Sequence, residues 1–361
     1  MKVALTHDYL HQYGGAERVA QVLHEIFPDA PIYTSIFNPD NFPESFRKMD
    51  VRTSFMQKLP YIFKNFRAYL ALYPFAFQSF DLNNYDLIIS SSSAFAKGIR
   101  KRKDACHICY CHNPMRFVWN YDEYIKKENL PAIVKSIIPY GMMPFKLWDI
   151  NTSNHVDYFI ANSDAVASRI SSIYKKESQV IYPPIDTNRF HFSESNGNYF
   201  LAVSRLAAYK RIDLAIQAFN KLGYRLRIVG DGPALGSLKS ISSPNIEFLG
   251  KLDDKTINKL LSECKGLVLP GEEDFGMTPL EAAASGRPTI AYARGGALET
   301  VVDGKTGVLF EEQTSESLMN AVEKFDKMNF DKKTLRFQAE RFDKEIFKQK
   351  IRRFLNENKV L

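Results

Sequence analysis

The stretch 266–296, "GLVLPGEEDFGMTPLEAAASGRPTIAYARGG", contains one complete strand–loop–helix–strand unit. The apolar run 266–270 predicts a buried strand, and a polar loop with three acidic residues follows it. Thr278 and Pro279 predict the start of a helix, because a hydroxyl caps the first amides and a proline needs no amide hydrogen there. The run 288–293, "PTIAYA", predicts the next strand. Strands that alternate with helices are typical of a parallel sheet with helices on both faces.

The same alternation occurs on both sides of a proline-containing break at 180–198, which we interpret as a linker between domains. Before the break we predict strands at 2–7, 85–92, 106–111 and 157–163, and helices at 16–27 and 164–174. After it we predict strands at 199–204, 225–230, 245–250, 266–270 and 288–293, and helices at 212–222, 255–264 and 278–286. The chain is therefore expected to form two Rossmann-like α/β domains, 1–184 and 185–340, with a ligand cleft between them.

The bulk properties agree with a protein that binds an anion. The chain has 361 residues, a formal net charge of +7 and a pI near 9.0. Nucleic acid, nucleotide phosphates and an anionic membrane surface all fit this charge. No apolar run reaches the roughly 18 to 20 residues of a membrane-spanning helix. The N-terminus "MKVALTHDYL" has no leader pattern, so we expect folding from residue 1 and a cytoplasmic location.

Two segments concentrate the positive charge. Residues 51–80 carry four basic and no acidic residues among nine aromatic ones, and 97–103, "KGIRKRK", adds five more basic residues. A basic, aromatic-rich surface suits a membrane interface, where rings lie at headgroup depth and cations meet anionic lipid. The alternative is an amphipathic helical pair whose rings belong to the core and whose basic residues are only solvated.

The helix that starts near Thr278 predicts an anion site. The amides of Gly276, Met277 and Thr278 would point outward with the helix dipole behind them. Glu281 follows Thr278 by three residues, which suits either a capping box or hydrogen bonds to a diol such as a ribose. Glu273 lies eight residues earlier, in the loop before the anion site.

Two further groups could contact phosphates. Arg205 and Lys210 flank the loop after the strand 199–204, and two cations there can clamp a diphosphate and stabilise a departing phosphate. Either one alone would be more typical of a solvated loop. Gly14 and Gly15, in "YGGAERV" (13–19), open a helix without the G-x-G-x-x-G spacing. We interpret them as a place where a phosphate or sugar approaches the backbone.

The segment 106–112, "CHICYCH", holds three of the four cysteines. A zinc site needs four converging ligands, whereas alternation along a strand directs Cys106 away from Cys109 and Cys111. A buried strand with reduced thiols explains the composition better. Asn113 and Pro114 end this strand, so we expect His112 to emerge at the carboxyl edge of the N-terminal sheet, facing the cleft.

Five motifs resemble the retaining glycosyltransferases of family 4 and occur in the same order as in those enzymes. They are "GGAERV" (14–19), "VSRLAAYKRIDLAIQAF" (203–219), "RIVGDGP" (227–233), "NIEFLGKL" (245–252) and "EDFGMTPLEAAASG" (273–286). The resemblance spans nearly the whole chain. It implies a GT-B fold, in which two Rossmann-like domains face each other across a cleft and a C-terminal helix, here 341–361, returns to the N-terminal domain. It also implies that the C-terminal domain holds a nucleotide sugar and the N-terminal domain the acceptor.

The resemblance implies roles for individual residues. Glu273 would contact the donor sugar, Glu281 the ribose, and His112 the sugar near its reacting carbon. Arg205 and Lys210 would hold the diphosphate. Further contacts are expected from the amides of Phe275, Gly276, Met277 and Thr278, from Gly14 and Gly15, from Lys251 and Leu252 at the base, and from Arg116, Trp119 and Tyr121 on the acceptor side.

The chain has no D-x-D motif, so we expect neither a metal nor another cofactor. The family implies a front-side displacement in which the leaving phosphate helps to deprotonate the acceptor. The overall pattern is most similar to bacterial mannosyltransferases of surface-polysaccharide assembly. It favours GDP-mannose as donor, a glycan or lipid-linked sugar as acceptor, and a peripheral place on the inner face of the cell membrane.

Several alternatives stay open at this point. A UDP-sugar donor is close behind GDP-mannose. A nucleotide-sugar epimerase, a phosphorylase and a non-catalytic partner subunit that binds nucleotide sugar or membrane are further readings. A nucleic-acid binder is least favoured, because no recognised binding module is present.

Overall fold

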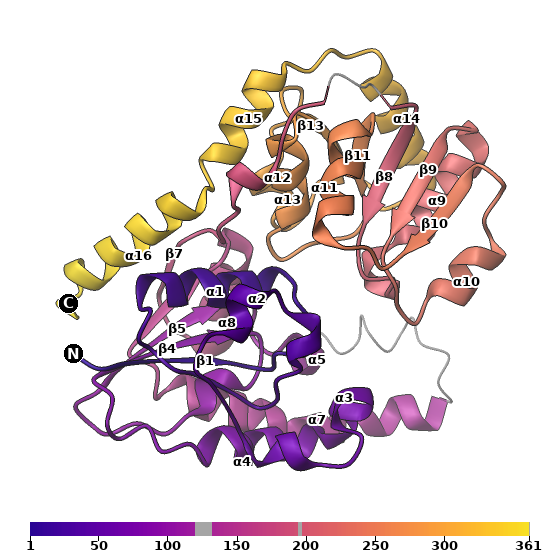
Figure 1. Cartoon of the computed structure of the whole chain (residues 1–361). Coiled ribbons are helices and arrows are strands. Elements are labelled where there is room, and N and C mark those ends of the chain that lie inside the picture. The colour runs from indigo at the N-terminus through magenta and orange to yellow at the C-terminus, as the bar shows by residue number, and fades with distance from the viewer. Residues whose placement is uncertain (120–131, 194–196, 361) are drawn as a thin grey trace. The chain divides into compact units, whose positions relative to one another are not determined.

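The computed structural model describes residues 1–119, 132–193 and 197–360, with the backbone alone for 132–137. The chain forms two compact units, one of residues 1–184 with 347–361 and one of residues 185–346. Each unit contains one parallel sheet with helices packed on it (Figure 1). The predicted α/β class with two Rossmann-like domains is confirmed.

The second unit extends past residue 340, where the sequence predicted its end. Phe342 packs on Phe275 with ring centroids 5.7 Å apart. The Ile185 amide donates to the Phe342 carbonyl, and the Lys344 amide donates to the Ile185 carbonyl, both at 2.9 Å. These contacts hold residues 341–346 in the second unit, so that only the segment from Phe347 onward belongs to the first.

The first sheet has the strand order β3-β2-β1-β4-β5-β6-β7. The strands are β1 (Val3–His7), β2 (Ile32–Thr34), β3 (Val51–Thr53), β4 (Leu87–Ser92), β5 (Cys106–Cys111), β6 (Tyr158–Ala161) and β7 (Ser178–Val180). The order reverses between β1 and β4, and such a reversal opens a crevice at the carboxyl ends of the two strands. His7 and Ser91 lie at this place.

Helices cover both faces of this sheet (Figure 1). One face packs against α1 (Gly15–Ile26), α2 (Glu44–Arg47) and α16 (Lys344–Glu357). The other packs against α3 (Ile62–Asn65), α4 (Tyr73–Gln78), α5 (Arg116–Trp119), α7 (Ala132–Ser153) and α8 (Asp164–Tyr174). Short 3-10 turns join these elements: η1 (Pro39–Asn41), η2 (Phe55–Lys58), η3 (Phe66–Leu72) and η4 (Ala96–Gly98).

Strand β5 is buried on both faces. Ile108 and Tyr110 join the core under α1 and α16, whereas Cys109 and Cys111 join the core under α8. The four cysteines are free thiols. In the described part of the chain, no three His, Cys, Asp or Glu side chains are grouped so that they could hold a metal ion.

The second sheet has the order β10-β9-β8-β11-β12-β13 and reverses between β8 and β11. Its strands are β8 (Tyr199–Val203), β9 (Arg225–Val229), β10 (Ile246–Gly250), β11 (Gly266–Leu269), β12 (Thr289–Tyr292) and β13 (Gly307–Phe310). The helices α9 (Ile212–Leu222), α10 (Leu235–Ser240) and α14 (Ser315–Asp326) pack on one apolar cluster. The helix α12 (Met277–Ala284) contacts α11 (Asp254–Glu263), α13 (Ala297–Thr300) and α15 (Lys332–Glu340). The turns η5 (Thr187–Arg189) and η6 (Ala208–Lys210) complete this unit.

Among residues 1–119, 132–193 and 197–360, none of the helices combines the length and apolar character that crossing a bilayer requires.

Candidate active site

Glycines at the ends of the second unit's strands let its loops touch through their backbones. A Cβ atom on Gly271 would lie 2.7 Å from the Lys210 carbonyl oxygen, and one on Gly295 would lie 2.2 Å from the Glu273 carbonyl oxygen. Both distances are far below van der Waals contact. The loops after β8, β11 and β12 therefore meet at one edge of the sheet, and this meeting brings Lys210 and Glu273 together.

Lys210 and Glu273 form a bidentate ion pair at that edge. The Lys210 Nζ atom lies 2.5 Å from each carboxylate oxygen of Glu273. Both side chains are mostly buried, at 16% and 17% exposure. Burial works against the ammonium, but the Glu273 charge and hydrogen bond outweigh it, so the pKa of Lys210 is raised above its ordinary value. The site therefore presents a charged lysine paired with a carboxylate.

The helix α12 begins beside this pair, and its N-cap lies two residues earlier than the predicted cap Thr278. Its N-cap is Gly276, in the left-handed conformation with φ 85°, and no side chain caps it. Thr278 is therefore the second helical residue, and the predicted Thr278 cap and Thr278–Glu281 capping box are wrong. The left-handed turn needs a glycine and starts the helix before Thr278. The amides of Met277 and Thr278 still lack intrahelical acceptors, as the predicted anion site requires.

The other predicted residues of the second unit lie at the same edge of its sheet. Arg205 is exposed in the loop directly after β8. Lys251 and Leu252 follow β10, and Gly250 before them has φ 69° and accepts a hydrogen bond from the Gly230 amide at 2.8 Å. Phe275 is buried, and Glu281 lies in α12. Their roles stay predictions.

In the first unit, Gly14 and Gly15 open a helix as predicted. Gly14 is the N-cap of α1, and its amide donates to Glu17 Oε2 at 2.9 Å. The buried Glu17 carboxylate therefore closes the first turn from within.

His112 follows β5 directly and is 9% exposed. Its Nε2 atom lies 2.7 Å from Ser91 Oγ, which lies 3.1 Å from His7 Nδ1. The other ring nitrogen of His7, Nε2, lies 3.7 Å from Glu17 Oε1. His112 lies at the carboxyl edge of the first sheet as predicted, whereas its neighbours Ser91, His7 and Glu17 were not predicted. The strand pattern could have indicated the two neighbours on strands. His7, Ser91 and His112 each stand two residues after an apolar residue (Leu5, Ile89 and Tyr110), and residues two apart in a strand point to the same face.

Asp8 was also not predicted as a site residue. It fixes the backbone of the loop that follows β4. Its carboxylate accepts the amides of Ser93, Ala94, Phe95 and Ala96 at 2.5, 3.1, 2.6 and 2.7 Å. Four amides on one buried carboxylate fix the backbone after β4, beside Ser91.

On the predicted acceptor side, Arg116 begins α5 and Trp119 ends it. The Trp119 Nε1 atom donates to Asp149 Oδ2 at 2.7 Å, which ties this helix to α7. Tyr121 lies outside the described residues.

The basic run 97–103 does not present five free cations. Lys97 is 2% exposed and pairs with the buried Asp149, while Lys101 pairs with Asp157 at 3.0 Å and Arg102 with Asp86 at 2.6 Å. The prediction that this run forms a basic membrane surface is wrong for Lys97, because the ammonium is enclosed between α7 and α8.

Family profiles match both halves of the chain. The profile for Glycosyltransferase Family 4 matches residues 13–189, and that for Glycosyl transferases group 1 matches residues 185–357. The chain belongs to glycosyltransferase family 4. It is a glycosyltransferase, and the sequence-based resemblance is confirmed.

Curated relatives of this family 4 enzyme include two α-1,3/1,6-mannosyltransferases. The protein from Dictyostelium discoideum is 27% identical over 299 residues, covering 69% of this chain and 67% of the relative. The protein from Candida albicans is 24% identical over 384 residues, covering 84% of each chain.

Solved GT-B structures share the fold over its whole length. The Anabaena protein HepE, in complex with UDP and glucose, matches with a TM-score of 0.73 and 20% identity over 99% of both chains. Sucrose-phosphate synthase from Thermosynechococcus elongatus matches with a TM-score of 0.79 and 18% identity over 100% of both.

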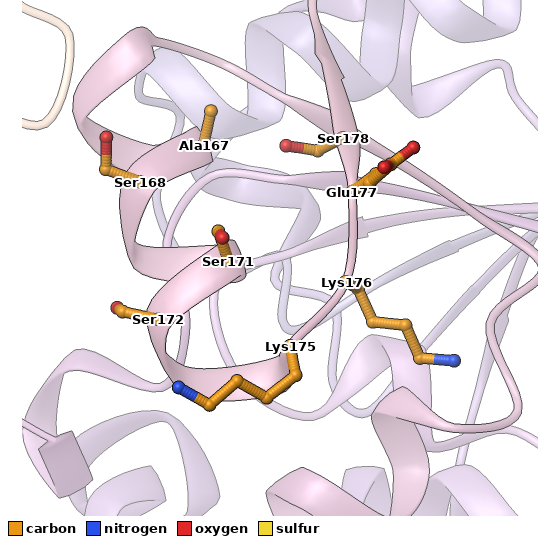
Figure 2. A pocket seen from close by; sticks show the side chains of 8 residues that line it. All are labelled: Ala167, Ser168, Ser171, Ser172, Lys175, Lys176, Glu177 and Ser178. Atoms are coloured by element: carbon orange, nitrogen blue, oxygen red, sulfur yellow. The ribbon is translucent and has the colours of Figure 1, made fainter.

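A surface hollow of this family 4 enzyme lies elsewhere. Figure 2 shows it between α8 and β7, lined by Ala167, Ser168, Ser171, Ser172, Lys175, Lys176, Glu177 and Ser178. The end of α8 and the start of β7 lie at the amino edge of the first sheet, opposite His112. None of the predicted site residues lines it.

Proposed function

We propose that this enzyme transfers a hexose with retention of configuration to a hydroxyl of a glycan or lipid-linked sugar. The donor proposed first is GDP-mannose, and two relatives named α-1,3/1,6-mannosyltransferase support it. A UDP-sugar is the second candidate, supported by the solved complex of HepE with UDP and glucose. The observation that carries the proposal is the Lys210–Glu273 pair beside the α12 N-terminus, which offers a cation, amides and a carboxylate to a sugar diphosphate.

The proposed roles follow from these chemistries. Lys210 and Arg205 bind the diphosphate, together with the amides at the start of α12. Glu273 accepts hydrogen bonds from hydroxyls of the donor sugar, and Glu281 accepts them from the ribose. In this scheme Lys210 pairs with Glu273 alone when no donor is bound. When the donor binds, Lys210 pairs with both Glu273 and the diphosphate.

The reaction breaks the bond between the anomeric carbon and the diphosphate oxygen and forms a bond from that carbon to the acceptor oxygen on the same face. The acceptor proton passes to the departing phosphate oxygen, so the products are the glycoside and the nucleoside diphosphate. Lys210 and Arg205 stabilise the charge that develops on the leaving group. Charge neutralisation by these cations and the α12 amides supports a reaction without a bound metal.

The test measures nucleotide release with a panel of nucleotide sugars and an acceptor extract. GDP-mannose is expected to give saturable GDP release, and Glu273→Gln is expected to lower kcat by about 100-fold or more. Glu247→Gln, which alters the ion pair between Glu247 on β10 and Arg227 on β9, is the matched control and should leave kcat unchanged. Saturable UDP release from a UDP-sugar, with no GDP release from GDP-mannose, would show that the donor is a UDP-sugar. Unchanged turnover in the Glu273 variant would refute the proposed site.

We also propose that the first unit contacts anionic membrane through residues 51–80. Phe55, Tyr61 and Phe75 are exposed large hydrophobic residues, while Tyr73 and Phe77 are buried in the core. The segment therefore contains both exposed and buried aromatic rings. Lys64 and Arg67 are exposed, and the outer side of α7 adds three apolar residues, Tyr140, Met143 and Leu147. Exposed rings beside cations suit the lipid interface.

The double variant Lys64→Ser/Arg67→Ser is expected to bind vesicles of anionic lipid about 30-fold more weakly, since each basic residue contributes about 1 kcal/mol at such a surface and about 1.4 kcal/mol is tenfold. Activity on a soluble acceptor should be unchanged. The matched control is Arg352→Ser/Arg353→Ser, which removes two exposed charges from α16. Equal vesicle binding by the two double variants would exclude this surface.

A further inference from the structure

Four polar side chains form a row at the carboxyl edge of the first sheet. His7 on β1 and Ser91 on β4 are direct partners in the strand register, and Ser91 is the partner of Tyr110 on β5. His112 stands two residues beyond Tyr110, so its side chain projects on the same face. Glu17 reaches this row from the first turn of α1.

The row is buried from end to end. The exposed fractions are 4% for Glu17, 3% for His7, 2% for Ser91 and 9% for His112. With water largely excluded, the hydrogen-bond direction at each position is set by the neighbouring side chain. The hydrogen bonding of Glu17 therefore determines, through His7 and Ser91, which ring nitrogen of His112 carries the proton.

Glu17 fixes the proton on His7. One carboxylate oxygen accepts the Gly14 amide, and the other faces His7 Nε2 at 3.7 Å. A lone pair on Nε2 would be repelled by this carboxylate, so the ring proton lies on Nε2. In the neutral imidazole Nδ1 is then an acceptor, and the Ser91 hydroxyl, 3.1 Å away, donates to it.

Ser91 determines the direction of its hydrogen bond with His112. A serine hydroxyl has a single hydrogen, and in this arrangement it is used at His7. The Ser91 Oγ atom must then accept from His112 Nε2, which lies 2.7 Å away. His112 would thus carry its proton on Nε2 and a lone pair on Nδ1.

We propose that His7 and Ser91 are positioning residues that hold His112 with its proton on Nε2, the tautomer in which His112 serves the transfer reaction. The inference deepens the proposed function and rests on it for the role of His112. The tautomer itself is independent of any substrate.

The first experiment reads the tautomer directly in the full chain. Histidine-selective ¹⁵N labelling and two-bond ¹H–¹⁵N spectra distinguish the two neutral forms, and His112→Asn assigns the signals. The wild-type protein is expected to show the proton of His112 on Nε2, and Ser91→Ala is expected to show a mixture of tautomers. The matched control is Ser90→Ala, which removes the equivalent 2.9 Å contact between Ser90 and His107 on the opposite face.

The second experiment separates positioning from folding. Ser91→Ala is expected to lower kcat by about 10-fold or more with KM for the donor changed less than about twofold, as is typical for loss of an orienting neighbour. Ser90→Ala should keep kcat while losing similar stability. His7→Asn retains an acceptor near the Nδ1 position and should keep the tautomer, whereas His7→Leu should lose it.

A wild-type His112 with its proton on Nδ1, or a Ser91→Ala protein with an unchanged tautomer, would overturn the inference. Failure of every nucleotide sugar as a donor would instead overturn the proposed function, because the spectra do not depend on turnover.

Discussion

Lys210 and Glu273 are separated by 63 residues in the chain and meet at one sheet edge. His112, Ser91, His7 and Glu17 meet at the corresponding edge of the other unit. At both places polar side chains lie at or beyond the carboxyl ends of apolar strands: His7 ends β1, His112 follows β5, and Glu273 lies in the loop after β11. The backbone of a strand end is held by its neighbours, which helps to fix the positions of these side chains.

His107 gives a prediction for acid stability. It is completely buried, and desolvation lowers its pKa to about 3. Below pH 6.5 the unfolded chain binds a proton that the folded chain does not, so stability falls as the pH drops from 6.5 towards 3. Between pH 7 and pH 5 the wild type should lose about 2 kcal/mol more stability than His107→Gln, which cannot titrate.

The measurement is denaturant unfolding followed by tryptophan fluorescence, because both tryptophans, Trp119 and Trp148, belong to the first unit. His191→Gln, which removes an exposed histidine, serves as the control and should keep the wild-type pH dependence. Parallel pH profiles for wild type and His107→Gln would contradict the prediction.

At the scale of elements, glycines decide how close the loops of the second unit come. Gly230, Gly271, Gly295 and Gly296 each stand where a Cβ atom would meet backbone of another loop within 2.7 Å. The motifs "VGDG", "PGEE" and "ARGG" are therefore packing requirements of the sheet edge. The left-handed Gly276 adds the turn that starts α12.

Gly271→Ala is expected to push the loop after β11 away from Lys210 and to raise the KM for the donor about 10-fold, because small displacements of binding groups are costly. The control is Gly236→Ala in α10, where a Cβ meets nothing within 4 Å. That change should keep KM and stabilise the helix by about 0.5–1 kcal/mol. Steady-state kinetics and thermal melts on both variants check the prediction, and an unchanged KM for Gly271→Ala would show that the contact is dispensable.

On the scale of the whole molecule, the chain leaves the first unit at residue 184 and rejoins it at residue 347. The rejoining helix contributes Phe347, Ile351, Phe354 and Leu355 to the first core. Phe347 packs edge-on against Tyr110 with centroids 5.7 Å apart, and Lys348 pairs with Glu25 at 2.6 Å. The first unit is thus completed by the last residues of the chain.

Phe347→Ala is expected to destabilise the first unit by about 3–5 kcal/mol, since a buried phenylalanine is removed from a packed core. Tryptophan fluorescence during denaturation reports this unit. Phe337→Ala, at a position 68% exposed on α15, is the control and should change little. A similar small effect for Phe347→Ala would mean that α16 is not part of the first core.

Much of the fold could be read from apolar runs of five or six residues. The predicted strands at 106–111 and 199–204 and the helices at 164–174 and 212–222 agree with β5, β8, α8 and α9. The strands β2, β3 and β7 were not predicted, because a strand of three residues is too short to show a period in its apolar residues. The helix α7 was not predicted, because Pro139 and Pro144 lie inside it.

The sequence by itself determined the alternation of strands and helices, the position of His112 after β5, and the order of motifs that marks the family. Only the tertiary structure decided that Lys210 pairs with Glu273, that Lys97 is buried on Asp149, and that His7 and Ser91 lie beside His112. The physical reason is range. Periodicity and capping act over a few neighbouring residues, whereas partners from different strands are chosen by strand order and register, which depend on the packing of the whole core.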